Sequence, residues 1–170
     1  MNTLPNWYER KFAFDFPTGL YVNLLVRLRG APARLEELAR ACSADLLIRK
    51  PEGKWSIQEN AGHLLDLEPL WLTRVADFLS GAQILSATDL GNRKTHEANH
   101  NARPIEKILA EFRQARFALL ERLEPLSSDL FSRSALHPRL KTPMRLVDHL
   151  YFVAEHDDHH LARIWELARL

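Results

Sequence analysis

The sequence contains little cysteine and little excess charge of either sign. Cys42 is the only cysteine, which excludes a disulfide framework or a thiolate metal cluster within the chain and fits a reducing cytoplasm. The 23 basic residues are balanced by 22 acidic ones, so the chain has no field that would gather nucleic acid or an anionic membrane. We therefore expect a cytoplasmic protein that binds neither.

Membrane signals and strand signals are also scarce. No stretch approaches the roughly 20 apolar residues of a membrane span, and the N-terminal M-N-T-L-P-N-W-Y-E-R-K lacks the apolar run of a signal peptide. β-branched residues rarely cluster, and no alternating run is followed by a hairpin dipeptide. Apolar residues make up 46% of the 170 residues and charged residues 26%, which is typical of globular proteins. This composition predicts one domain over residues 1–170.

Four segments do carry apolar residues at helical spacing. The first covers about residues 18–39, and Pro32 inside it predicts either one kinked helix or two collinear ones. The second begins at Ser56-Ile57-Gln58-Glu59, which matches the capping box, and ends near Leu79. Pro69 lies inside this second segment and predicts a kink.

The third and fourth segments are introduced by proline. The third starts at Pro104 and ends before Pro125, and the fourth takes Thr142 as its cap and Pro143 as its first residue. Long amphipathic helices with few strands predict an all-α fold, a four-helix bundle. The polar link over residues 81–103 is long enough to cross the end of the bundle or to cap a site there.

The fourth segment contains F-V-A-E-H-D-D-H-H-L-A-R-I-W-E-L over residues 152–167. His156 and His160 are four residues apart, so in a helix they share one face at roughly 5–6 Å between Cβ atoms. Both fall in the apolar stripe and point into the bundle. Two imidazoles placed in this way can converge on one divalent ion, and a buried imidazole without a metal needs a hydrogen-bond partner.

Other histidines in the sequence show that a four-residue spacing alone is weak evidence for a metal site. His96 and His100 have the same spacing, but they lie in the polar link, and we interpret them as solvated loop. His159 is off the stripe and is expected at the rim. His149 lies two turns before His156, too far to share an ion, so a core role or a hydrogen bond to a ligand fits it better. Asp157 is expected to be exposed.

A catalytic metal site expects a third protein ligand. The best candidate is His63, about two turns into the second segment. Gly62 beside it costs helix stability, which indicates a close packing contact there. Taken alone, a helical histidine like His63 is more often a core or surface residue.

Three short motifs in order resemble one known family. They are Trp55-Ser56-Ile57-Gln58-Glu59, then Gly62-His63-Leu64, and then His156-x-x-x-His160-Leu161-Ala162-x-Ile164. This pattern resembles the DinB/YfiT-like superfamily of bacterial proteins, over essentially the whole chain. Members of that family commonly have Gln where this chain has Arg163.

The resemblance implies a four-helix bundle with up-down-down-up connectivity, often a homodimer. It also implies one divalent transition metal ion held by three histidines, which here are His63, His156 and His160. Three imidazoles suit Zn or Ni, with Fe or Cu as alternatives. The family includes metal-dependent hydrolases and transferases or isomerases that use a low-molecular-weight thiol.

Such a site suits either chemistry, because the same ion would activate water, polarise a carbonyl or bind a thiolate. A hydrolase also needs a general base. Glu59 and Asp66 can share the face of His63, and each is a candidate base, fourth ligand or acceptor for an imidazole N–H. The alternative for Glu59 is a purely capping role, and for Asp66 a solvated position on the helix.

Candidate substrate-binding residues lie at two places. His137 and Arg139 precede the fourth segment and can reach over the site to hold an anionic group, although an ordinary loop has the same composition. Arg163 would either repel the ion or recruit an anionic substrate. The first hypothesis is therefore a metal-dependent hydrolase or thiol S-transferase acting on a small organic molecule.

The second hypothesis is a non-catalytic metal-binding or stress-response module whose metal is structural or regulatory. Coordination distinguishes the two. An enzyme keeps an open position that faces a cavity, whereas a structural site is closed by a fourth protein ligand such as Asp66 or Glu59. DNA binding is opposed by the charge balance and by the lack of a helix rich in Arg and Lys.

Overall fold

The protein is described here by a computed structural model that covers residues 4–51 and 53–169. The long helices are α1 (Tyr21–Arg40), α3 (Ile57–Ser80), α5 (Ile105–Leu123) and α6 (Leu146–Leu167). Short helices are α2 (Ala44–Ile48) and α4 (Arg93–Glu97), and short strands are β1 (Ser134–Leu136) and β2 (Pro143–Arg145). Single 3₁₀ turns lie at Trp7–Glu9, Thr18–Leu20, His100–Ala102 and Ser128–Ser132.

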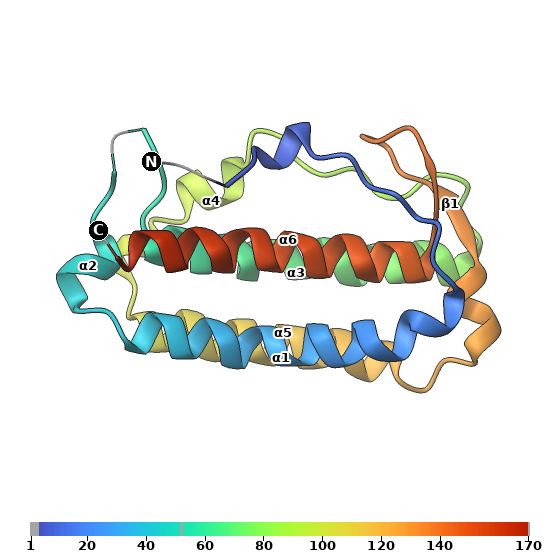
Figure 1. The fold of residues 1–170 in the computed structure, drawn as a ribbon, viewed down its shortest axis with the longest axis horizontal. Coiled ribbons are helices and arrows are strands. Elements are labelled where there is room, and N and C mark those ends of the chain that lie inside the picture. Colours follow the sequence, from blue (N-terminus) through green and yellow to red (C-terminus); the bar gives the residue numbers. More distant parts are fainter. Residues whose placement is uncertain (1–3, 52, 170) are drawn as a thin grey trace.

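The long helices form a bundle of two layers (Figure 1). α3 and α6 make up one layer and α1 and α5 the other, and α1 packs on α6 while α3 packs on α5. α1 and α6 run in one direction, and α3 and α5 run in the opposite direction. The predicted four-helix bundle with up-down-down-up connectivity is confirmed. α3 and α6 are therefore antiparallel, so the beginning of α3 lies beside the end of α6.

Local signals fix α3 as predicted. The Ser56 hydroxyl accepts the N–H of Glu59 at 3.0 Å, and the Glu59 carboxylate accepts the N–H of Ser56 at 2.9 Å, which completes the capping box. At the other end Gly81 has a φ of 75°, a left-handed conformation that glycine adopts without strain. α1 continues through Pro32 as one helix, which decides between the two predicted forms.

The start of the fourth helix is a correction. Thr142 and Pro143 do not begin it, because residues 143–145 pair with residues 134–136 as the antiparallel strands β2 and β1. The helix begins three residues later, where the Asp148 carboxylate accepts the N–H of Arg145 at 2.8 Å. Proline is tolerated as the first residue of such a short edge strand, because no backbone N–H is needed there for the strand pairing.

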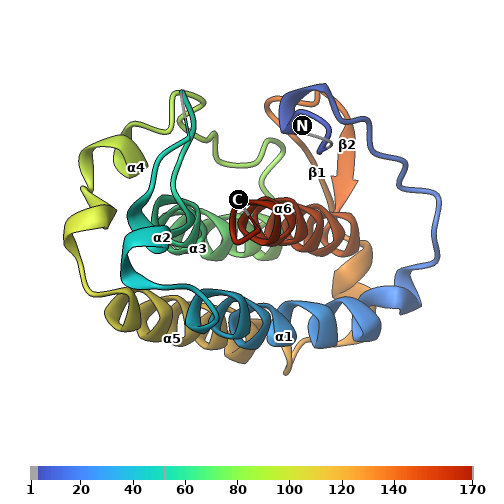
Figure 2. The ribbon, with the colours of Figure 1, turned by 60° about the vertical axis from the view of Figure 1, so that its left-hand side comes forward.

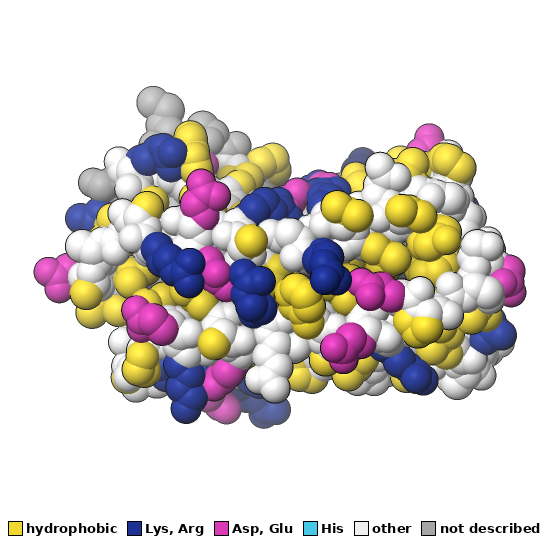
Figure 3. All heavy atoms as spheres, turned by 90° about the horizontal axis from the view of Figure 1, so that it is seen from below, with side chains coloured by type: hydrophobic (Ala, Val, Ile, Leu, Met, Phe, Trp, Pro, Cys, Tyr) yellow, Lys and Arg dark blue, Asp and Glu magenta, His cyan; other side chains and the backbone are white. Residues whose placement is uncertain are grey.

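The connecting segments gather on one side of the bundle. The N-terminal segment, the α4 region and the β1–β2 hairpin all lie over the layer of α3 and α6 (Figure 2). The opposite face, formed by α1 and α5, carries positive and negative side chains interspersed with apolar ones (Figure 3). Within the described residues, no helix is both long enough and apolar enough to span a membrane.

A buried ion cluster crosses the middle of the bundle. Arg116 of α5 is fully buried, and its guanidinium pairs with Glu68 of α3 and Asp157 of α6, each at 2.5 Å. Asp157 is 0% exposed, so the expectation that it would be exposed is wrong. The error follows from helix geometry, since residue 157 is next to the stripe that carries His156 and faces the bundle interior, where it meets the long side chain of Arg116.

Candidate metal centre

The antiparallel packing of α3 on α6 brings three histidines together. His63 lies in the second turn of α3, while His156 lies at the middle of α6 and His160 one turn later. Each offers one ring nitrogen, and these nitrogens all lie within 4.8 Å of one another. All three side chains are buried. The structure thus assembles the three residues that the sequence nominated as metal ligands.

Hydrogen bonds set the orientation of two of the rings. The Thr95 hydroxyl donates to the Asp66 carboxylate at 2.9 Å, so at 3.0 Å it accepts the Nδ1–H of His63. The Asn60 side-chain nitrogen donates to the carbonyl of Ser56 at 2.7 Å, so its Oδ1, at 2.9 Å, accepts the Nδ1–H of His160. Both imidazoles therefore carry their proton on Nδ1 and keep a bare Nε2 for a metal.

Electrostatics favour the neutral form that metal binding requires. Burial lowers the pKa of His63 to about 4. Burial also lowers the pKa values of His156 and His160 well below 6.5, and the neighbouring histidines lower them further. Nδ1 of His156 is buried and has no hydrogen-bond partner among the described residues. Three neutral imidazoles and an unpaired buried nitrogen are a donor set that fits a divalent transition metal.

Asp66 contacts this centre indirectly, through Thr95. Its carboxylate accepts from Thr95 and, at 2.8 Å, from Nε2 of His100. Because Thr95 in turn binds His63, the carboxylate orients a candidate ligand. His100 is only 1% exposed, so the interpretation of His100 as solvated loop is wrong, although His96 is exposed as expected. The polar residues around His100 hid the inward turn of the chain at that point.

Gly62 explains how His100 reaches Asp66. The close packing predicted at this glycine is confirmed, because an added Cβ would lie 2.3 Å from Cγ of His100. The imidazole thus rests directly on the backbone of α3.

Replacing Gly62 with alanine is expected to lower the free energy of unfolding by about 1–3 kcal/mol, because the new methyl group would displace the His100 ring. The matched control is Gly30→Ala in α1, where nothing lies within 4 Å of the added Cβ. That control is expected to be neutral or to stabilise by up to about 1 kcal/mol. Urea denaturation followed by circular dichroism measures both, and equal effects would contradict the contact.

A cavity of about 450 Å³ opens beside two of the three histidines, His63 and His160. His63 and His160 form part of its wall together with Trp55, His159 and Arg163. The Trp55 ring lies 4.7 Å from that of His63. His159 lies at the edge of this cavity, in agreement with the expected rim position. An opening of this size would admit a small organic molecule.

The N-terminal segment closes another side of the centre. The Trp7 ring lies 5.0 Å from that of His156, and Arg10 forms an ion pair with Glu155. Sequence reasoning missed this segment, because no local pattern indicates that residues before the first helix return to the last one. Asn60 was also missed, although its position three residues before His63 places it on the same side of α3.

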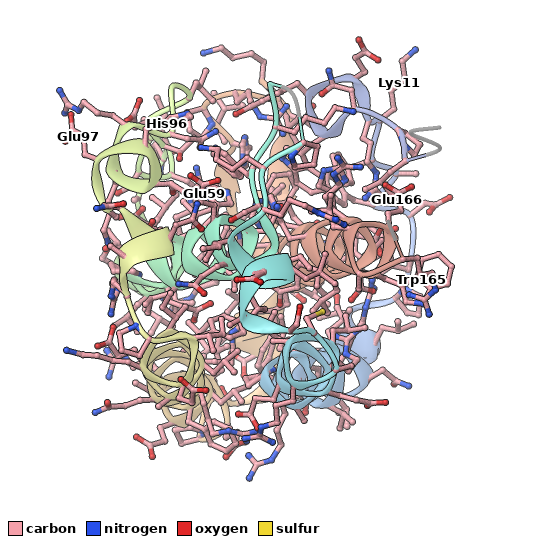
Figure 4. The ribbon with its side chains drawn as sticks, turned by 90° about the vertical axis from the view of Figure 1, so that its left-hand side faces the viewer. Lys11, Glu59, His96, Glu97, Trp165 and Glu166 are labelled. Atoms are coloured by element: carbon pink, nitrogen blue, oxygen red, sulfur yellow. The ribbon has the colours of Figure 1, made fainter. Side chains whose placement is uncertain are left out.

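The remaining predicted residues fall into different surroundings. Glu59 holds the start of α3 and pairs with Lys50 at 2.8 Å, and Figure 4 shows it near that start, below His96. Arg163 lines the large cavity and donates to Glu166 at 2.9 Å. His137 and Arg139 line a separate small cavity, which they share with His63 and His156.

Comparisons with known proteins agree with this architecture. The family model described as the DinB superfamily matches residues 27–164. YfiT from Bacillus subtilis, described as a probable metal-dependent hydrolase with an unusual four-helix bundle topology, has a TM-score of 0.81 at 21% identity, covering 95% of this chain and 93% of that one. A mycothiol-dependent maleylpyruvate isomerase has a TM-score of 0.67 at 12% identity, covering 87% of this chain and 60% of that one. At these identities both likenesses show the fold alone, and no curated protein matches the chain.

Proposed function

Because the chain belongs to the DinB superfamily, we propose that it is a metal-dependent enzyme that acts on a small organic substrate. His63, His156 and His160 would hold one divalent transition metal ion, with zinc or nickel as the first candidates. The observation that carries this proposal is the set of three buried, neutral imidazoles, two of which border a cavity of about 450 Å³.

The surroundings favour a catalytic centre over a structural one. A structural site is normally closed by a fourth protein ligand. Among the described residues, no carboxylate or thiol belongs to the group of candidate ligands. The Asp66 carboxylate is occupied by Thr95 and His100, and the Glu59 carboxylate by Ser56 and Lys50. This leaves the fourth position to water or substrate, and it supports the enzyme against the non-catalytic stress-response module.

Two reaction classes fit such a centre. A bound divalent ion would lower the pKa of water towards about 7, polarise a carbonyl oxygen, and bind a thiol as thiolate. The description of YfiT as a probable metal-dependent hydrolase supports a hydrolase. The mycothiol dependence of the isomerase supports a low-molecular-weight-thiol S-transferase. Asp66 would act by orienting His63 through Thr95. The general-base role of Glu59 stays a prediction.

A homodimer and a cytoplasmic location also stay predictions. A dimer interface would fit the start of α1 and the 3₁₀ turn before it, where Leu20, Val22 and Val26 are exposed apolar side chains.

Metal content per chain tests the proposal. Untagged protein, reconstituted with Zn²⁺ and dialysed, is expected to retain close to one ion per chain by plasma mass spectrometry. His160→Ala should lose most of it, because two imidazoles and water bind zinc far more weakly than three imidazoles do. His96→Ala is the matched control, since His96 is exposed and outside the candidate group.

Circular dichroism of each variant separates loss of metal from loss of fold. A folded wild type that retains no ion after reconstitution would contradict the proposal, as would a His160→Ala protein that retains as much as the wild type.

A further inference from the structure

A second, smaller cavity borders two of the candidate ligands. Its volume is about 40 Å³, and His63 and His156 form one part of its wall. Arg74, His137 and Arg139 form another part. A water molecule needs roughly 10–15 Å³ of such space, so the chamber holds about three non-hydrogen atoms.

Arg74 brings an unpaired cation into this chamber. It lies eleven positions after His63 on α3, three turns along the same face. The side chain is buried, its Nε donates to the carbonyl of Ser86 at 2.9 Å, and its Nη2 has no hydrogen-bond partner within residues 4–51 and 53–169. Burial lowers the pKa of Arg74 to about 10, and the positive charge of Arg139 contributes to that shift. The guanidinium is still charged at neutral pH.

Arg139 adds a second guanidinium to the same wall. Its Nη2 is also buried, with no hydrogen-bond partner among the residues that the structure describes. The guanidinium lies over the rings of Tyr8 and Phe152. In the described part of the chain, neither arginine forms an ion pair with a carboxylate. Asp89 borders the chamber, but its carboxylate accepts the backbone N–H groups of Gly91 and Arg93.

The tautomer of His137 adds a third donor. Its Nδ1 accepts the backbone N–H of Arg139 at 3.2 Å and that of Leu140 at 3.1 Å, so Nδ1 carries no proton. Burial and the two arginines lower the pKa of His137 to about 3, so the ring is neutral and its single proton is on Nε2. That Nε2 lies 3.3 Å from Nη1 of Arg74. Two donors therefore face each other with no acceptor between them.

We propose that this chamber is a carboxylate subsite, in which Arg74, His137 and Arg139 donate to one carboxylate group of the substrate. Unpaired buried donors are costly, and an anionic acceptor would satisfy all three at once through charge-assisted bonds. The volume fits the three atoms of a carboxylate better than the five of a phosphate. Resting on the proposed metal centre, this assigns the substrate class: a small carboxylic acid whose reacting group lies next to its carboxylate, beside His63 and His156.

Binding of simple anions tests the subsite without any turnover. The protein is titrated with sodium propionate, sodium phosphate and neutral propionamide, both with Zn²⁺ and after removal of metal by a chelator, while ¹H–¹⁵N NMR follows the arginine Nε–H signals. Propionate is expected to bind in the millimolar range with and without zinc, and to shift the Arg74 signal. Phosphate and propionamide should each bind at least about tenfold more weakly than propionate does.

Variants then identify the donors. Arg139→Gln is expected to weaken propionate binding about tenfold, because it removes one charge-assisted contact. Arg29→Gln is the control of equal charge change, since Arg29 pairs with Glu124 in the other layer of the bundle, and it should bind propionate as the wild type does. Arg74→Lys, which keeps the buried charge, should also weaken binding, and it serves as the second test if Arg139→Gln does not fold.

The outcomes separate this inference from the metal proposal. Propionate binding that requires zinc, or that survives Arg139→Gln and Arg74→Lys in folded protein, would overturn the subsite and leave the metal centre standing. Equal binding of phosphate would overturn the carboxylate assignment. Propionate binding that depends on Arg139 in a protein that retains no metal would support the subsite and remove the proposed metal chemistry.

Discussion

Replacing Arg116 with methionine is expected to lower the free energy of unfolding by about 3–5 kcal/mol, because Glu68 and Asp157 would stay buried without their cation. Arg116 is 0% exposed, and it also donates to the carbonyl of Leu28 at 3.3 Å. Burial raises the pKa values of both carboxyl groups even with the arginine present. Without it, each carboxylate must either take up a proton or remain an uncompensated charge in the bundle core.

Two controls make this prediction specific. Arg113→Met lies one turn earlier on α5, where Arg113 pairs with Glu36 at 2.7 Å but is partly exposed, and it should cost less than about 1 kcal/mol. The triple variant Arg116→Met, Glu68→Met, Asp157→Leu removes every charge of the cluster and should recover most of the loss. Urea denaturation followed by circular dichroism measures all three. An Arg116→Met protein no less stable than Arg113→Met would contradict the argument.

Acid is expected to destabilise the metal-free protein steeply, by several kcal/mol between pH 7 and pH 5. Unfolded histidines have pKa values near 6.5, whereas burial lowers those of His63 and His137 to about 4 and about 3. The pKa values of His149, His156 and His160 are also well below 6.5 because of burial. Below pH 6.5 the unfolded chain therefore binds more protons than the folded one, and stability falls as pH falls.

The size and the limits of the effect follow from the same values. Each histidine that stays neutral in the folded protein lowers the free energy of unfolding by about 1.4 kcal/mol for every pH unit below its unfolded pKa. The contribution of His63 ends near pH 4 and that of His137 near pH 3. The core carboxyl groups, whose pKa values are raised, act in the opposite direction. Urea denaturation midpoints, measured in the presence of a chelator at intervals of half a pH unit, give the net slope of stability against pH.

His149 provides the control for the acid prediction. It is 1% exposed, neither ring nitrogen has a hydrogen-bond partner among the described residues, and it is outside the candidate ligand group. His149→Leu should reduce the proton uptake on unfolding by about one and flatten the slope accordingly. A wild-type free energy of unfolding that is unchanged from pH 7 to pH 5 would show that the buried histidines do not carry the predicted penalty.

Most of the fold was predictable because its determinants are local. The capping box at Ser56 starts α3 as expected, and the helix ends at Ser80, one residue beyond the predicted end near Leu79. Helical spacing placed His156 and His160 on the inner face of α6. The start of α6 was not predictable in this way. Pro143 has a strong preference for the first turn of a helix, but pairing of its strand with residues 134–136 overrides it, and that pairing is set by the tertiary fold.

Spacing and resemblance were enough to nominate the three candidate ligands, which the fold brings together, whereas the groups that contact them were not predictable. Thr95 and His100 lie in a link whose polar composition indicates solvent, yet the chain turns them inward onto Asp66. From the sequence alone, Arg74 cannot be distinguished from an ordinary polar residue on α3. Its unpaired guanidinium becomes visible only once the hairpin has brought His137 and Arg139 beside it.

The position of two candidate ligands on α6 has a consequence for how the protein is made. α6 is the last helix of the described chain, and it packs on α1 and α3, while Trp7 of the N-terminal segment rests on His156. During translation, the apolar stripes of α1 and α3 therefore stay without this partner until α6 has left the ribosome. The proposed metal site cannot assemble on a chain that still lacks α6. Binding of the proposed ion would therefore have to follow the synthesis of α6, and a ribosome that stalls before α6 would release a polypeptide with exposed apolar helices for chaperones or proteases.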